Sequence, residues 1–469
     1  MAYDRCPAPY VGRMAFSLPP GFRFGVATSG FQTEGGFNGP GEPANNWRDW
    51  EQAGRVEPSG IALDFWNRYE DHLDRAVAAG CDAFRLSVEW ARGEPADGEV
   101  DYGALERYAA ILDACTERGL EPVVALHHYT HPHWLGPDFW VRQDSPERFV
   151  AWAGLVVEQL AMRCRRWITI NEINGYAVQT YGLGALPPGR RAANGDVVRT
   201  LDHMLAAHVL AHAAIHRRQP SATVSTNNHA SSLYELDRLL LDVLGARRRG
   251  VARADLRAWL AGRRSAYYAA LPPPGLPDTV LRRLTASVVP LDQALPRAVS
   301  AVYESPFDRA LDVVKLDYYD PVAAHHLVEV GRQTWNDTVD PHGLGTYLSA
   351  NLEPGLELVV AENGLSNRVR EGRAFPRRDG WDRVRYLRAN LAAVAGAVEA
   401  GLPVTGYFHW TLADCYEWGS YQPRFGLYAV DREGGVRWRE EDSMGGNAAG
   451  TYKKLIEKMR GGRRPQTPP

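Results

Sequence analysis

The chain has 469 residues, 45% of them hydrophobic and 23% charged, with a formal net charge of -3. A chain of this length can bury a large core, and α/β barrels often run this long as one domain. The near-neutral charge gives no electrostatic reason to expect nucleic acid or an anionic membrane as a partner.

Targeting and metal-binding patterns are missing from the sequence. No apolar run is long enough for a signal peptide or a membrane span, and the five cysteines have no disulfide-framework spacing. We therefore expect a reduced, cytoplasmic protein. The sequence has neither a CxxC nor an HExxH pattern, so we expect no metal and no cofactor.

Short β-rich runs alternate with longer amphipathic stretches along the chain, which is typical of βα units with parallel strands. Most of the runs are apolar on both faces, as in strands covered by helices. Eight strands are predicted, at residues 24–28, 83–88, 122–127, 167–171, 222–226, 313–318, 358–361 and 404–410. Helices are predicted between them, for example at 101–118 and 382–400. The predicted fold is α/β, a single (β/α)8 TIM barrel spanning residues 16–460.

One long segment interrupts this alternation. Residues 231–309 are rich in arginine and largely helical in pattern, and they fall between the fifth and sixth strands. Segments that follow a barrel strand lie at the face where such barrels carry their sites. We expect a helical insertion that walls the site, not a separate domain. The tail, residues 461–469, is expected to be disordered.

Two glutamates lie at predicted strand ends. The fourth strand runs into TINE, which contains Glu172, and the seventh into VVAENG, which contains Glu362. The carboxyl ends of barrel strands converge, so these two side chains can face each other. Glycoside hydrolysis uses such a pair, although a strand-terminal glutamate is also often only a salt-bridge partner.

Polar and aromatic residues gather at the other strand ends as well. Sugars are bound by planar polar groups and aromatic faces of this kind. The residues are Gln32, Glu34, Arg85, His127, His128, Tyr129, Asn171, Asp317, Tyr318, Tyr319, Trp410, Asp414, Cys415, Tyr416, Glu417 and Trp418. So many strand ends with such residues are hard to explain by packing alone.

These motifs resemble those of glycoside hydrolase family 1, the β-glucosidase family. The blocks that carry the resemblance are FRFGVATSGFQTEGG (22–36), DFWNRYEDHLDRAVAAGCDAFRLSVEWAR (64–92), VVALHHYTHPHWL (123–135), TINE (169–172), LDYY (316–319), AENG (361–364) and YFHWTLADCYEWGSYQPRFGLYAVD (407–431). They follow one another in consistent order over nearly the whole chain.

The resemblance implies a retaining β-glycosidase that acts on a small-molecule β-D-glucoside, with galactosides and fucosides as further candidates. It implies that Glu172 is the general acid/base and Glu362 the nucleophile, with Arg85 and Tyr319 holding Glu362. Glu172 would be protonated at rest and Glu362 charged, with their carboxyl groups about 5–5.5 Å apart. The implied sugar-binding residues are Gln32, His128, Asn171, Trp410, Glu417 and Trp418.

Several positions depart from the family pattern. Asp317 stands where asparagine is usual, and if ionised it would raise the pKa of Glu362 unless a cation compensates. Ile173 replaces the proline after Asn-Glu, and Tyr129 with Thr130 replaces an aromatic-aspartate pair. Cys415 replaces a common asparagine, and we expect it to pack rather than react.

The loop after Trp418 is one residue shorter than usual. The phospho-β-glycosidase branch replaces this tryptophan with a small residue and supplies a lysine, whereas here Trp418 is present. No lysine lies between Lys315 and Lys453. The sequence therefore argues against a 6-phosphosugar substrate.

Three other functions remain open from sequence. A non-catalytic sugar-binding homologue would fit the barrel, with Asp317 as the feature in its favour. A transglycosidase or tailoring enzyme for a secondary-metabolite glycoside would use the same catalytic residues. A barrel lyase or aldolase fits poorly, because Lys315 is the one lysine near a strand end and is expected to lie in the core or in an ion pair. The oligomeric state is not predicted.

Overall fold

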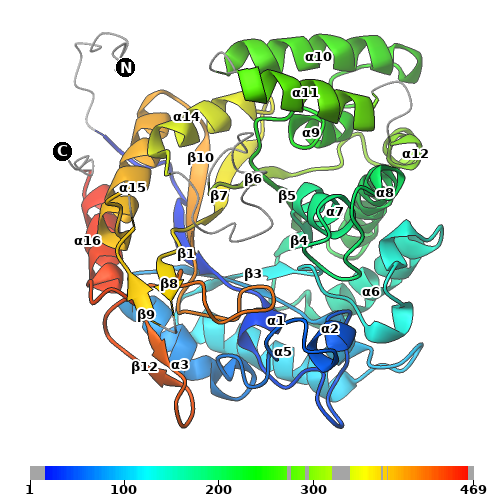
Figure 1. Ribbon diagram of the computed structural model, residues 1–469. Helices are drawn as coiled ribbons and strands as arrows, with labels where there is room; N and C mark the ends of the chain where they lie inside the picture. Colours follow the sequence, from blue (N-terminus) through cyan, green and yellow to red (C-terminus); the bar gives the residue numbers. More distant parts are fainter. Residues whose placement is uncertain are drawn as a thin grey trace.

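The structure is a computed structural model that describes residues 16–271, 276–290, 295–319, 339–370, 373–377 and 379–462. Eight parallel strands close a barrel in the order β1-β10-β7-β6-β5-β4-β3-β2 (Figure 1). They are β1 (Arg23–Ala27), β2 (Ala83–Ser87), β3 (Glu121–Ala125), β4 (Arg166–Asn171), β5 (Thr223–His229), β6 (Val313–Asp317), β7 (Glu357–Asn363) and β10 (Val404–Trp410). Each overlaps one predicted strand, so the predicted (β/α)8 TIM barrel is confirmed.

Longer helices surround the barrel and connect its strands (Figure 1). In chain order they are α3 (Phe65–Ala78), α5 (Tyr102–Glu117), α6 (Ser145–Leu160), α8 (Asn194–Arg218), α12 (Pro296–Glu304), α14 (Pro341–Ala350), α15 (Arg383–Glu399) and α16 (Ala448–Arg460). The predicted helices at 101–118 and 382–400 correspond to α5 and α15. Each begins after an aspartate cap, because Asp101 accepts from the amide of Ala104 (2.9 Å) and Asp382 from that of Arg385 (2.7 Å).

Shorter elements lie in the loops. The short helices are α1 (Gly30–Thr33), α2 (Arg48–Gln52), α4 (Trp90–Gly93), η1 (His133–Leu135), η2 (Phe139–Val141), α7 (Ile173–Ala177), η3 (Val178–Gly182) and η4 (Arg253–Asp255). Two antiparallel pairs join β8 (Arg368–Arg370) to β9 (Arg373–Phe375) and β11 (Val430–Asp431) to β12 (Arg437–Trp438).

The barrel strands are buried on both faces, as their continuous apolar runs predict. Every residue of β2 and of β6 is buried. The register shifts near two carboxyl ends, where Asn171 of β4 lies opposite Asn227 of β5 and Asp317 of β6 lies opposite Glu362 of β7. Such irregularities re-aim side chains. Here they bring Asp317 beside Glu362.

The segment between β5 and β6 is helical, as predicted. It contains α9 (Arg238–Gly245), α10 (Leu256–Ala270), α11 (Leu276–Val288) and α12, and it lies over one side of the barrel (green in Figure 1). α11 and α12 pack on α8, and α10 contacts α14. The insertion therefore rests on the outer helices, and its role as a wall of the site stays a prediction.

The ends of the chain are described only in part. Residues 1–15, which include Cys6, and residues 463–469 of the predicted tail lie outside the described residues. Cys81, Cys115, Cys164 and Cys415 are buried and free. In the part of the chain that the structure describes, no helix is both long and apolar enough to cross a membrane.

Candidate active site

The two glutamates singled out from the sequence meet at the carboxyl ends of β4 and β7. One carboxylate oxygen from each of Glu172, Asp317 and Glu362 lies within 4.8 Å of the others. Glu172 is 8% exposed and Glu362 3% exposed. Three carboxyl groups therefore share one buried space, where they must be balanced by cations, hydrogen-bond donors or protons.

Glu362 is held by an arginine and a tyrosine. Arg85, which is 1% exposed, donates from Nη1 to Oε1 of Glu362 (2.5 Å), and Tyr319 donates its hydroxyl to Oε2 (2.6 Å). Arg85 also donates to Asn171. The structure thus brings these four predicted site residues together. Burial raises the pKa of Glu362 to about 7, against the opposing effects of Arg85 and Tyr319.

Glu172 is held by a different tyrosine and by a histidine. Tyr129 donates its hydroxyl to Oε2 of Glu172 (2.6 Å), and Nδ1 of His229 lies 2.9 Å from Oε1. Burial acts to raise the pKa of Glu172, but His229, Tyr129 and Arg85 together outweigh it and hold that pKa below its ordinary value. The sequence predicts the opposite shift, and His229 is the physical reason for the difference.

The backbone around Glu172 is strained. Glu172 (φ 42°), Tyr129 (φ 69°) and Trp418 (φ 45°) adopt the left-handed conformation that non-glycine residues avoid. Each such residue costs about 1–3 kcal/mol, and strain of this kind concentrates at functional sites. A Cβ at Gly175 would lie 2.4 Å from the Tyr129 hydroxyl, so glycine is required for that hydroxyl to reach Glu172.

Asp317 is the unusual carboxylate of the cluster. It is fully buried, accepts a hydrogen bond from Asn227 and has its Oδ1 4.0 Å from Nη1 of Arg85. Burial, and then the charge of Glu362, raise the pKa of Asp317 well above its ordinary value. Burial and Glu362 therefore both favour the protonated, uncharged form of Asp317.

Glu417 is the centre of a second group of predicted site residues. Its Oε2 accepts from Nε2 of Gln32 (2.9 Å), and its Oε1 accepts from Nε1 of Trp410 (2.9 Å). The Cys415 thiol donates to Oε1 as well (3.2 Å). Burial raises the pKa of the thiol well above its ordinary value, which opposes formation of a reactive thiolate. Cys415 is thus a buried donor to Glu417.

His128 lies between two tryptophans. Its ring stacks on Trp410 (centroids 5.8 Å apart) and on Trp418 (5.6 Å). Trp418 also stacks on Trp47 (5.7 Å) and packs against Tyr129 (4.9 Å). The predicted sugar-binding aromatics therefore form one stack that reaches the tyrosine bound to Glu172.

Two residues that contact the clustered carboxylates were missed from the sequence: Asn227, which donates to Asp317, and His229, which contacts Glu172. The predicted fifth strand ends at residue 226, whereas β5 continues through Asn227 to His229. The polar run Asn227-Asn228-His229 at a strand end was the available signal. Lys315, expected in the core or in an ion pair, is 5% exposed, and its Nζ has no hydrogen-bond partner among the described residues.

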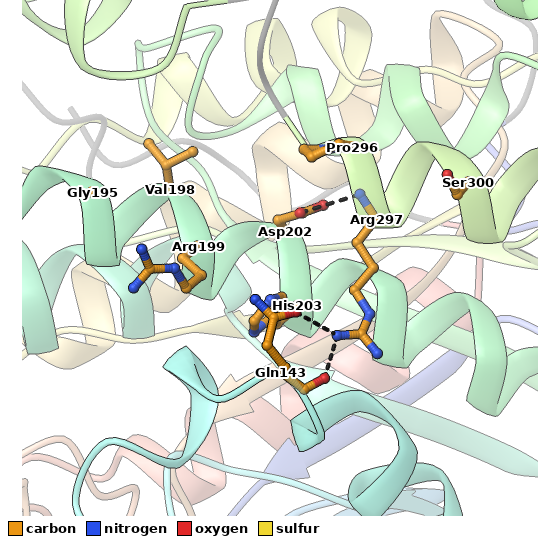
Figure 2. A pocket seen from close by; sticks show the side chains of 9 residues that line it. All are labelled: Gln143, Gly195, Val198, Arg199, Asp202, His203, Pro296, Arg297 and Ser300. Atoms are coloured by element: carbon orange, nitrogen blue, oxygen red, sulfur yellow. Dashed lines mark hydrogen bonds between the residues drawn. The ribbon is translucent and has the colours of Figure 1, made fainter.

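A pocket of about 600 Å³ lies elsewhere, between α8, α12 and the loop before α6 (Figure 2). It is lined by Gln143, Gly195, Val198, Arg199, Asp202, His203, Pro296, Arg297 and Ser300. None of these was predicted as a site residue, and none lies on a barrel strand. Arg297 is already paired with both carboxylate oxygens of Glu147 (2.6 and 2.7 Å). This pocket is therefore separate from the candidate active site.

Comparison with known proteins shows to which family the chain belongs. The sequence matches Glycosyl hydrolase family 1 over residues 14–263 and 304–459. The unmatched residues 264–303 fall inside the insertion. The chain is 30% identical to a bifunctional beta-D-glucosidase/beta-D-fucosidase of Bifidobacterium breve, over 91% of this chain and 97% of that protein.

Two further proteins, less similar in sequence, also match nearly the whole chain. The chain is 26% identical to 6-phospho-beta-galactosidase 1 of Streptococcus pneumoniae strain R6, over 91% of this chain and 97% of that protein. The fold is similar to that of the beta-glucosidase from Thermotoga maritima in complex with deoxynojirimycin, with a TM-score of 0.72 and 21% identity over 94% of this chain and 99% of that one. The chain therefore belongs to glycosyl hydrolase family 1 and is a β-glucosidase-like glycoside hydrolase.

Proposed function

We propose that the chain is a retaining β-glycosidase in which Glu362 is the nucleophile and Glu172 the acid/base. The observation that carries this proposal is the separation of the two glutamates, which have carboxylate oxygens within 4.8 Å of each other. An inverting enzyme needs about 6.5–9.5 Å between its carboxyl groups to fit a water molecule, whereas a retaining enzyme needs about 5–5.5 Å.

In the first step Glu362 attacks the anomeric carbon. The bond from that carbon to Oε of Glu362 forms as the bond to the leaving oxygen breaks. The leaving oxygen takes, through Glu172, the proton that Glu172 shares with His229. Arg85 and Tyr319 each donate a hydrogen bond to one oxygen of Glu362. These bonds orient the carboxylate for attack, and Arg85 balances its negative charge. With a pKa of about 7, Glu362 is mostly charged only above that pH.

In the second step water attacks the anomeric carbon and releases Glu362. Glu172 accepts the water proton, which restores the starting state. His229 contacts the same carboxylate, so the Glu172–His229 pair can hold one proton between them. When His229 is protonated it favours the charged form of Glu172, which is the form that acts as a base.

The sugar-binding group supports an unphosphorylated glycone. Gln32 and Glu417 offer planar polar groups beside the indole of Trp410, an arrangement suited to sugar hydroxyls over an aromatic face. Trp418 fills the position next to His128 and Trp47, and no lysine occurs between Lys315 and Lys453. We therefore infer a β-D-glucoside or β-D-fucoside rather than a 6-phosphogalactoside.

The test is p-nitrophenol release from the β-glucoside, β-fucoside, β-galactoside and 6-phospho-β-galactoside by the wild-type protein and by Glu362→Gln. We expect release from the unphosphorylated sugars and a loss of at least about 10⁴-fold in the variant. An unchanged thermal unfolding curve would show that the variant is folded. Equal release by both proteins would reject Glu362 as the nucleophile.

If no substrate is cleaved by the wild-type protein while a glucose-type inhibitor still binds, the chain is a sugar-binding homologue instead. A second candidate function is transfer of the sugar to an alcohol acceptor. The observation in its favour is the stretch at 264–303, which the family match leaves out and which could serve a specialised aglycone. Product analysis with added alcohols separates the two: alkyl glycosides indicate transfer, and free sugar alone indicates hydrolysis.

A further inference from the structure

A second cluster of metal-ligating side chains lies at the opposite end of the barrel strands. His212 and His216 are one turn apart on α8, so both project from the same helix face. Asp312 lies in the segment that enters β6. One ligand atom of each residue lies within 4.8 Å of the other two.

His212 is the residue that points to a ligand. It is 1% exposed, and its one polar contact among the described residues is a long one, to Asp312. Its Nε2 faces Oδ1 of Asp312 at 3.5 Å, which is close to the spacing of two ligands on one zinc ion. A contact of 3.5 Å is too long for a good hydrogen bond, so this buried imidazole is poorly satisfied as it stands.

The other two residues are held in place. Oδ2 of Asp312 lies 2.7 Å from Nε2 of His216 and accepts from the amide of Val224 (2.8 Å), at the start of β5. The Phe307 ring packs near both histidines, with centroids 6.0 Å from His212 and 5.6 Å from His216. The carboxylate and the two imidazoles are thus oriented by the fold, with an apolar ring beside them.

One cation competes for the same carboxylate. Nε of Arg309 lies 3.2 Å from Oδ1 of Asp312, and the Arg309 side chain is 50% exposed. An arginine this exposed can turn into solvent at small cost, because exposed ion pairs contribute little stability. Arg309 therefore balances Asp312 when no other cation is present.

We propose that Nε2 of His212, Nε2 of His216 and a carboxylate oxygen of Asp312 bind a divalent metal ion of the zinc type. Two imidazoles and one carboxylate suit zinc, cobalt or nickel, whereas magnesium and calcium prefer oxygen ligands. The sequence alone does not indicate this site, because the histidines are spaced HxxxH and the third ligand is distant in the chain. The cluster joins α8 to the starts of β5 and β6, away from Glu172 and Glu362, so the ion would stabilise the fold.

The experiment uses metal-stripped, tag-free, full-length protein titrated with zinc chloride in a calorimeter. We expect one ion per chain and a rise in Tm of a few degrees at saturating zinc. His212→Gln is the decisive variant, because His212 has only its long contact to Asp312 to lose. Its metal-free Tm should stay near that of the wild-type protein, while its zinc affinity should fall by at least about 100-fold.

Arg309→Gln is the matched variant. Removal of the competing cation should tighten zinc binding, although it removes an ion pair from the metal-free protein. Absorption bands of bound cobalt(II) in the wild-type protein, lost in His212→Gln, would identify the ligands. The proposal is overturned if the wild-type protein binds no zinc, or if His212→Gln binds it equally well. p-Nitrophenol release measured in parallel reports separately on the glutamates.

Discussion

The surroundings of Glu362 and Glu172 are built on the same plan with one difference. Each carboxylate accepts a tyrosine hydroxyl at 2.6 Å, from Tyr319 for Glu362 and from Tyr129 for Glu172. The other oxygen of each carboxylate contacts a nitrogen-containing side chain. For Glu362 this side chain is Arg85, which stays charged, and for Glu172 it is His229, which can gain or lose a proton.

This difference matches the roles that we propose for the two carboxylates. A nucleophile has to be charged when it attacks, and a permanent cation serves that purpose throughout the cycle. An acid/base has to give a proton in one step and accept one in the next. His229 is also the more accessible partner, with its side chain 28% exposed against 1% for Arg85. The arrangement thus separates a fixed charge from an exchangeable proton.

Replacement of Glu172, the proposed acid/base, should give the largest effect of the variants that test this comparison. Glu172→Gln removes the proton donor, so kcat/KM for substrates with poor leaving groups should fall by about 10²–10⁴-fold. Substrates with a good leaving group should suffer much less, because departure then needs little protonation. Steady-state kinetics with alkyl and nitrophenyl glucosides measure this difference.

Azide provides the control for Glu172→Gln. As a small nucleophile that needs no base, it should restore turnover of the glycosyl-enzyme and yield a glycosyl azide. An equal loss for good and poor leaving groups, with no effect of azide, would contradict the acid/base role.

His229→Gln should give the next largest effect, about tenfold on kcat. His229 holds the pKa of Glu172 down, so its removal should raise that pKa. Glu172 then stays protonated to higher pH. It still serves as an acid in the first step, but a smaller fraction of it is in the basic form that the second step needs. We expect the glycosyl-enzyme to accumulate, seen as a burst of p-nitrophenol in stopped-flow measurements. A merely structural histidine would lower activity without a burst.

The residues at the strand ends of this site can be predicted from the sequence. The contacts that cannot be predicted share one cause, which is the exact register and length of the strands. Glu172 and Glu362 were candidates because each ends a predicted strand and barrel topology makes such ends converge, and the family resemblance then implied their roles. The pairing of Asp317 with Glu362 and the reach of His229 to Glu172 depend on register shifts and on the true end of β5. A displacement of one or two residues leaves the strand pattern unchanged but decides which side chain meets which carboxylate.

Tyr319→Phe tests the tyrosine on the nucleophile side. The Tyr319 hydroxyl stabilises charged Glu362, so its loss should raise the pKa of Glu362 above about 7. The acid limb of kcat/KM should then move to higher pH by about one unit. Activity should fall several-fold at pH 6 and much less at pH 9.

Tyr129→Phe is the matched control, because Tyr129 donates to Glu172 instead. It should leave the acid limb where it is in the wild-type protein. An equal shift in both variants would mean that the acid limb does not belong to Glu362 alone.

Asp317→Asn should give the smallest effect on activity, because it replaces a carboxyl group whose uncharged form is favoured by an amide of the same shape. The variant should instead differ from the wild-type protein in how its stability depends on pH. The pKa of Asp317 is raised above its ordinary 3.8 in the folded protein, so the folded state binds this proton more tightly than the unfolded state. Wild-type stability therefore falls as the pH rises above about 4, whereas the asparagine variant has no such loss. The two Tm values should be closest near pH 4, and the variant should gain relative to the wild-type protein toward pH 8. A Tm difference that does not change with pH would mean that Asp317 is charged in the folded protein, so that three negative carboxylates would share the site with Arg85.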